Sequence, residues 1–196
     1  MIQVKSSHGI TALPIDSRLL ADRKIFLEGE INSEMACRFV KRVLLLAKEN
    51  KTLPIDVLIT STGGEIGAGM LIYDTIRTCG VPIRMFCLGH AYSMAAILFA
   101  SGTHGRYMLP NSELMLHEPL LGNRIGGNCS SIKSISDSMQ ETRRRVNRIL
   151  AKHTGKTEEE VEKATSYDHY FTPEEAIDFN LCDGVRGFDL LLEDME

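Results

Sequence analysis

The chain has 196 residues, a formal net charge of −4, 43% hydrophobic residues and 24% charged residues. This length and composition are typical of one globular domain and exclude a disordered chain. The slight acidity argues against nucleic-acid binding, because no basic excess is available to neutralise phosphates. The five cysteines form no CxxC pair, and no signal peptide or membrane span is visible. We therefore expect a cytoplasmic protein without disulfides.

Short apolar runs alternate with amphipathic helical patterns, as in βαβ units. The predicted strands are residues 24–29, 54–60, 82–88, 106–109 and 113–117. A helix that Asn32 or Ser33 caps follows the first strand. Its predicted apolar face comprises Met35, Phe39, Val40, Val43, Leu44 and Ala47. The spacing of the strands predicts an α/β fold built as a repeated βα superhelix.

The pattern changes after the fifth predicted strand. Residues 119–130 contain three glycines, so we expect an extended loop or hairpin there. A long helix is predicted over 131–153, with an apolar stripe typical of packing. Capping boxes at 157–160 and 172–175 predict two helix starts, and the second helix should run over 173–180.

Two strand-to-helix junctions carry residues suited to chemistry. Residues 61–64 (Ser-Thr-Gly-Gly) open a helix, whose free backbone N–H groups suit an anion or a developing oxyanion. The ordinary alternative is a tight turn, and the missing GxGxxG spacing and P-loop lysine argue against nucleotide binding. At the second junction Ser93 precedes an apolar helix. It is either a simple N-cap or a nucleophile next to the N–H of Met94.

Two later residues are ordinary when each is taken alone. His117 ends an apolar strand without HExxH spacing, and Asp168 lies in an aromatic-rich loop. With Ser93 they supply the three residue types of a catalytic triad, which geometry defines and chain order does not. The backbone N–H groups of Gly64 and Met94 would then form the oxyanion hole.

Eight segments occur in one order with the spacing of a known family. They are Ser17–Leu20, Arg23–Leu27, Ser61–Gly64, Ile72–Asp74, Ser93–Ala95, Leu109–Ser112, Met115–Leu120 and Phe171–Ala176. Through them, residues 17–185 resemble the proteolytic subunit family of Clp proteases (ClpP). The resemblance implies that Ser93 is the nucleophile, His117 the general base and acid, and Asp168 the orienting carboxylate. It places Gly64 and Met94 in the oxyanion hole.

The resemblance also implies an architecture. Residues 1–196 would form a single peptidase domain of crotonase-like (ClpP-type) α/β fold. Residues 1–16 would be an N-terminal pore loop or propeptide, 118–153 a protruding strand–helix handle, and 186–196 a short tail. Subunits of this family form heptameric rings, usually two stacked, and receive unfolded polypeptides from an AAA+ unfoldase. We thus expect no metal and no cofactor, with ATP used only by the partner ATPase, and no nucleic acid or membrane as partner.

Several positions depart from the family pattern. Thr62 replaces a proline, which should loosen the oxyanion loop. Tyr92 stands where the family has a small residue, which should narrow the substrate cleft. Tyr167 replaces an arginine that helps pair two rings. Asp56 and Leu58 replace aromatic residues near the ATPase docking pocket, which should weaken binding of a standard unfoldase.

Three functions fit these observations. The first is a serine endopeptidase that acts through an acyl-enzyme. The second is a non-catalytic or partner-activated subunit of a mixed Clp ring, and the third is a crotonase-type acyl-CoA enzyme. The combination of Ser93, His117 and Asp168 favours the first, because neither a non-catalytic subunit nor an acyl-CoA enzyme requires all three.

Overall fold

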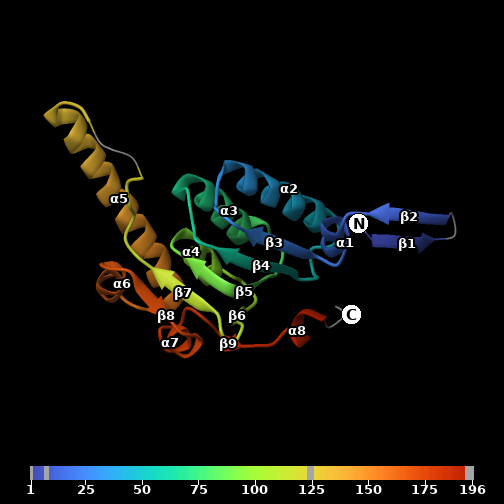
Figure 1. Ribbon diagram of the computed structural model, residues 1–196. Helices are drawn as coiled ribbons and strands as arrows, with labels where there is room; N and C mark the ends of the chain where they lie inside the picture. Colours follow the sequence, from blue (N-terminus) through green and yellow to red (C-terminus); the bar gives the residue numbers. More distant parts are fainter. Residues whose placement is uncertain (1, 7–8, 123–125, 193–196) are drawn as a thin grey trace.

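The computed structural model describes residues 2–6, 9–122 and 126–192 (Figure 1). The helices are α1 (Ile15–Ala21), α2 (Ser33–Glu49), α3 (Ile66–Thr78), α4 (Met94–Ala100), α5 (Cys129–Thr154), α6 (Glu158–Thr165), α7 (Pro173–Asp178) and α8 (Asp189–Leu192). The strands are β1 (Ile2–Ser6), β2 (Gly9–Leu13), β3 (Lys24–Glu28), β4 (Ile55–Ser61), β5 (Ile83–Tyr92), β6 (Arg106–Met108), β7 (Glu113–Leu116), β8 (His169–Phe171) and β9 (Gly184–Val185). None of the helices in these ranges combines the length and apolar character needed to cross a membrane.

The main sheet is almost entirely parallel. Its order is β3-β4-β5-β6-β9, and β7 pairs with the end of β5 and with β8. Only β8 runs antiparallel to its neighbour, while β1 and β2 form a separate antiparallel hairpin. Helices α2, α3 and α4 lie over one face of the sheet (Figure 1). The predicted α/β class with a parallel sheet is therefore confirmed.

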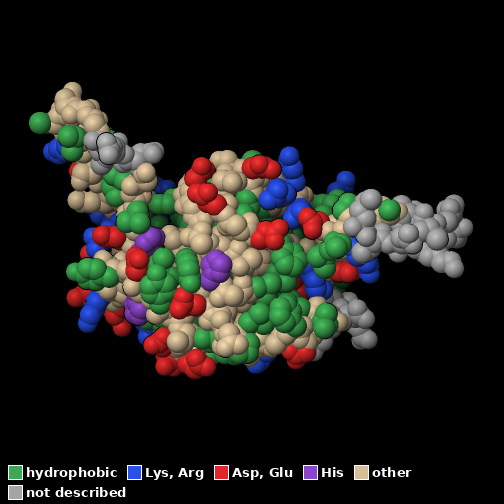
Figure 2. All heavy atoms as spheres, viewed as in Figure 1, with side chains coloured by type: hydrophobic (Ala, Val, Ile, Leu, Met, Phe, Trp, Pro, Cys, Tyr) green, Lys and Arg blue, Asp and Glu red, His purple; other side chains and the backbone are tan. Residues whose placement is uncertain are grey.

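Strand alternation divides the sheet into two faces. On β4, Ile55, Val57 and Ile59 join the main core beneath the helices, and the residues between them point to the second face. A smaller apolar cluster lies on this second face, near α8 (Figure 2). It consists of Leu58, Phe86 and Leu191 with the partly buried Phe26, Leu88, Tyr107 and Leu190.

Asp56 is also buried on the second face. Both of its carboxylate oxygens accept hydrogen bonds from Arg84, its neighbour on β5, at 2.6 and 2.9 Å. Such a bidentate pair compensates for the cost of burying the charge. The charge of Asp56 is therefore balanced within the same chain by the guanidinium of Arg84.

The third predicted strand is longer in the structure than in the sequence pattern. It was predicted to end at residue 88, but β5 continues to Tyr92. Gly89 has a φ of 84°, and the pairing of β4 with β5 shifts register near this point. Pairing of His90–Tyr92 with β7 stabilises the extension, and such a distant partner is invisible in local periodicity.

The apolar face of α2 was predicted partly wrongly. Leu44 is 64% exposed, whereas Leu46, which the prediction omitted, is 1% exposed and lies in the core. The buried stripe runs through Met35, Phe39 and Val43 to Leu46, at helical spacings of three and four. Leu44 therefore lies on the outer side of the helix.

Helix α5 starts two residues earlier than predicted, because the side chain of Asn128 accepts the N–H of Ser131 as an N-cap. Its first half projects from the domain (Figure 1), and Ile132 there is exposed. Only the second half, through Val146 and Leu150, reaches the core. The described parts of 119–130 contain no strand, and residues 123–125 of the predicted handle lie outside the described ranges.

Two leucines of α2 test this assignment of faces. Leu46→Ala should lower the free energy of unfolding by about 2–5 kcal/mol, because it leaves a cavity in the core. Leu44→Ala should change it by less than about 0.5 kcal/mol. Denaturant unfolding of both variants provides the measurement. An equal loss for Leu44→Ala would contradict the assignment.

Candidate active site

Ser93 occupies a sharp bend between β5 and α4. Its φ of 55° and ψ of −124° are unusual for a residue with a side chain. Its N–H donates to the carbonyl of Met115 at 2.8 Å, which fixes the bend against β7. Ser93 stands at the N-cap position of α4, but its side chain makes no capping hydrogen bond to the helix. The hydroxyl is instead directed toward a histidine.

His117 lies between the other two predicted residues. Its Nε2 is 2.8 Å from Ser93 Oγ, and its Nδ1 is 3.2 Å from Asp168 Oδ1. The histidine side chain is 15% exposed and the aspartate side chain 60% exposed. The serine hydroxyl can donate to Nε2 when Nδ1–H donates to the carboxylate, as general-base catalysis requires. The structure thus brings the three predicted residues into one hydrogen-bonded row.

The register of three strands explains why these residues meet. Tyr92 of β5 is paired with Met115 of β7, so Ser93 emerges beside the end of β7. Leu116 of β7 is paired with His169 of β8. The residue after Leu116 and the residue before His169 are therefore neighbours across the antiparallel pair. These two residues are His117 and Asp168.

The Gly63-Gly64 loop packs directly against the Ser93 bend. Gly63 has a φ of 93°, and a Cβ there would lie 2.8 Å from Ser93 Cβ. Ile31 holds the loop from its other side, because its N–H donates to Gly63 O and its carbonyl accepts from Glu65 N, both at 2.8 Å. Sequence patterns do not reveal this role of Ile31, since only its backbone atoms take part.

The two N–H groups predicted for an oxyanion hole lie beside this bend. Within the ranges that the structure describes, neither the N–H of Gly64 nor that of Met94 donates a hydrogen bond. Met94 begins α4, so its N–H lies at the positive end of the helix. Gly69 of α3 leaves space for its side chain, because a Cβ at Gly69 would overlap Met94. Both N–H groups are thus available to a negatively charged oxygen.

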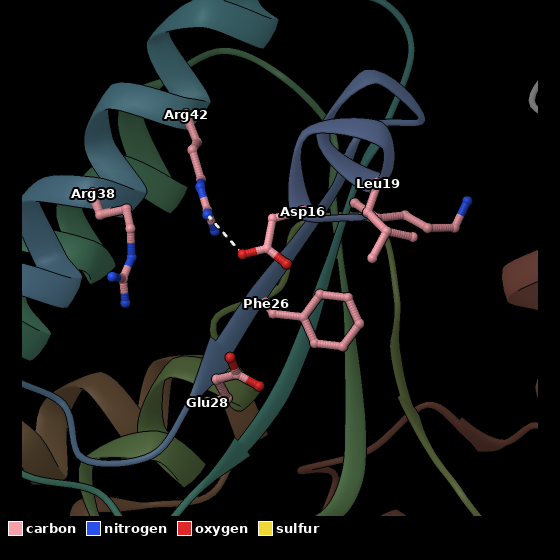
Figure 3. A pocket seen from close by; sticks show the side chains of 7 residues that line it. Asp16, Leu19, Phe26, Glu28, Arg38 and Arg42 are labelled. Carbon is pink, nitrogen blue, oxygen red and sulfur yellow. Dashed lines mark ion pairs between the residues drawn. The ribbon is translucent and has the colours of Figure 1, made fainter. Parts of the chain in front are cut away.

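A separate hollow of about 90 Å³ lies between α1, β3 and α2 (Figure 3). Arg42 points across it toward Asp16 at 4.0 Å, and Arg38, Glu28 and Phe26 line the remainder. Its lining includes no residue of the hydrogen-bonded row. Among the described residues, no group of three or more His, Cys, Asp or Glu side chains is arranged to hold a metal ion.

An α/β domain with hydrogen-bonded serine, histidine and aspartate side chains has the arrangement of serine hydrolases. Comparison with known proteins identifies the family. The sequence model of the Clp protease family matches residues 7–187. The ATP-dependent Clp protease proteolytic subunit of Ligilactobacillus salivarius (strain UCC118) is 38% identical over 182 residues, which cover 92% of this chain and 91% of that protein. The chain belongs to the Clp protease family, a family of serine endopeptidases, and the resemblance seen in the sequence is confirmed.

A capping box follows β8, the strand that begins directly after Asp168. The side chain of Glu175 accepts the N–H of Thr172 at 2.9 Å, and the Glu175 N–H donates to the Thr172 hydroxyl at 3.3 Å. These contacts with Thr172 lower the pKa of the Glu175 carboxyl. The box therefore fixes the start of α7 directly after β8.

Substituting glycines tests the geometry of the loop. Gly64→Ala should lower the free energy of unfolding by more than about 1 kcal/mol, because φ is 150° and the new Cβ would overlap the Ile31 carbonyl. Gly67→Ala in α3 is the matched control, since a Cβ there meets nothing within 4 Å. It should be neutral or stabilise by about 0.5–1 kcal/mol. Equal effects of both changes in denaturant unfolding would refute the close approach.

The capping box predicts a pH dependence. Because folding lowers the Glu175 pKa, its carboxylate stabilises the fold above the unfolded pKa of about 4.3. This contribution is lost as the pH falls through the lower folded value. Glu175→Ala should therefore lower Tm at pH 7, and the difference from wild type should narrow at pH 3. A Tm difference that stays the same between pH 7 and pH 3 would contradict this contribution.

Proposed function

We propose that the chain is the serine endopeptidase subunit of a Clp-type self-compartmentalised protease. In this proposal it hydrolyses peptide bonds of unfolded polypeptides through a Ser-His-Asp triad and an acyl-enzyme. The single observation that carries the proposal is the row from Ser93 through His117 to Asp168, at 2.8 and 3.2 Å. The underlying fold would be a crotonase-like βα superhelix with a protruding handle.

The proposed reaction has two halves. Ser93 Oγ attacks the scissile carbonyl while His117 Nε2 accepts its proton, and Asp168 holds the ring and stabilises the imidazolium. The N–H groups of Gly64 and Met94 bind the oxygen of the tetrahedral intermediate. His117 then protonates the leaving amine. Water, activated by the same histidine, releases the acyl group and regenerates Ser93.

The proposed assembly is a homomeric heptameric ring, single or as two stacked rings, that works with an AAA+ unfoldase in cytoplasmic protein quality control. The projecting half of α5 supports an assembly, because it exposes Ile132 and leaves Ile135 and Met139 only partly covered. In an isolated subunit the apolar side chains of this projection would stay in contact with water, which does not stabilise the fold. The subunit itself would need no cofactor, since ATP would be used by the partner ATPase.

A second candidate is a partner-activated subunit of a mixed Clp ring. One observation favours it: Asp168 is 60% exposed, and its contact with His117 is longer than that between His117 and Ser93. Tyr167, beside it, is also exposed. A neighbouring subunit that covers these residues would tighten the triad.

Labelling with a fluorophosphonate tests the proposed function, because an activated serine attacks its phosphorus, displaces fluoride and becomes phosphonylated. Intact mass should show one adduct, which peptide mapping assigns to Ser93 and which Ser93→Ala abolishes. His117→Ala and Asp168→Asn should slow labelling by about 10³- to 10⁴-fold, since triad members act as a unit.

Three results would count against the leading proposal. An adduct at another serine would exclude Ser93 as the nucleophile. Labelling of Ser93 only after addition of a ring partner would favour the partner-activated subunit. Tight binding of CoA thioesters without any labelling would instead point to an acyl-CoA enzyme.

A further inference from the structure

A row of three side chains crosses the sheet next to the candidate triad. Tyr92 of β5 is paired with Met115 of β7, which is paired with Tyr170 of β8. The preceding row, formed by Ala91, Leu114 and Phe171, belongs to the main core. Because successive side chains of a strand point to opposite faces, the row containing Tyr92 lies on the second face.

Each member of this row is close in sequence to one member of the triad. Ser93 directly follows Tyr92, His117 lies two residues after Met115, and Asp168 lies two residues before Tyr170. A displacement of one strand in the row would therefore move the corresponding triad residue relative to the other two. The packing of this row of side chains therefore affects the positions of the three triad residues relative to one another.

Tyr92 makes contacts with both other strands of the row. Its hydroxyl donates to Glu113 Oε1 on β7 at 2.6 Å, and this bond to a carboxylate raises the pKa of Tyr92 to about 12. Its ring meets Tyr170 of β8 edge-on, with centroids 5.8 Å apart. His90 packs on the ring from β5 itself, at 4.9 Å. One side chain thus connects β5, β7 and β8.

Asp168 has little else to hold it in place. Its carboxylate is 60% exposed, and within the described ranges its hydrogen bonds are limited to that with His117. The strand that follows, β8, has three residues and pairs only with β7 among the described strands. The position of Asp168 therefore depends on how firmly β8 is held against its neighbours.

We propose that Tyr92 is a positioning residue of the triad: through its bond to Glu113 and its contact with Tyr170, it holds β8 in place and thereby holds Asp168 against His117. This inference rests on the proposed function. In this inference Tyr92, the bulky residue before the nucleophile, supports the triad. The sequence alone leads us to expect only that Tyr92 narrows the substrate cleft.

A double-mutant cycle tests the inference, with the second-order rate of fluorophosphonate labelling as the measurement. Tyr92→Ala should slow labelling about tenfold or more in the wild-type background. In the Asp168→Asn background it should change the rate by less than about twofold, because the group that it positions is already lost. Equal losses in both backgrounds would overturn the inference.

Further variants separate positioning from a general loss of stability. Tyr107→Ala removes a half-buried ring from the same face of the sheet, 5.3 Å from Phe86, and should leave the labelling rate within about twofold of wild type. Tyr92→Phe retains the contact with Tyr170 and should recover most of the rate lost in Tyr92→Ala. If Tyr92→Ala fails to fold, Tyr92→Phe and Glu113→Gln replace it in the cycle, with smaller losses expected.

Peptide turnover gives a second, independent readout. A positioning role predicts that Tyr92→Ala lowers kcat and leaves KM within about twofold, because substrate binding is not its task. A change confined to KM, or faster turnover of bulky peptides, would show that Tyr92 lines the cleft and would overturn the inference. Where labelling in the Asp168→Asn background is too slow to measure, the effect of Tyr92→Ala on kcat and KM decides between the two roles of Tyr92.

The labelling experiment also separates the two proposals. Failure of the wild type to label would refute the proposed function itself, whereas normal labelling with additive losses would refute only the role of Tyr92.

Discussion

The pairing of β7 with two different strands is the constraint on which the candidate site depends. β7 runs parallel to β5 on one side and antiparallel to β8 on the other. Ser93 and His117 therefore emerge at the carboxyl ends of adjacent parallel strands, where α/β sheets commonly place their functional residues. The antiparallel β8 enters from the opposite direction and brings Asp168 to the same edge. A slip of one residue in either pairing would turn the side chains to the other face.

Unusual backbone conformations complete the site and explain its glycine-rich junction. Ser93 has a positive φ, which turns its hydroxyl away from α4 and toward His117. Gly63 then has to approach the bend so closely that no Cβ fits beside Ser93. Backbone strain of this kind persists only where surrounding contacts hold it. Here the contacts are the bonds that Ile31 makes to the loop and the bond from Ser93 N to Met115.

Local sequence patterns predicted the structure correctly where interactions between residues close in sequence determine it. Both capping boxes form as predicted, because their donors and acceptors lie three residues apart. Predictions failed where contacts with residues distant in sequence determine the length of a strand or the buried face of a helix. β5 extends to Tyr92 because β7 pairs with it, and the exposed Leu44 shows that helical periodicity alone did not define the buried face of α2. Ser93 stands at the N-cap position of α4 without a capping bond, and its hydroxyl contacts the distant His117.

The sequence by itself determined the α/β class, the family and the residue types of the candidate site, because these follow from periodicity, spacing and ordered motifs. It also predicted the N–H groups of Gly64 and Met94 as the donors of an oxyanion hole. Only the tertiary structure decided that His117 touches both Ser93 and Asp168, and that Tyr92 connects Glu113 with Tyr170. The physical reason is that these contacts join side chains from β5, β7 and β8. Their proximity results from strand register, which no single segment of the chain encodes.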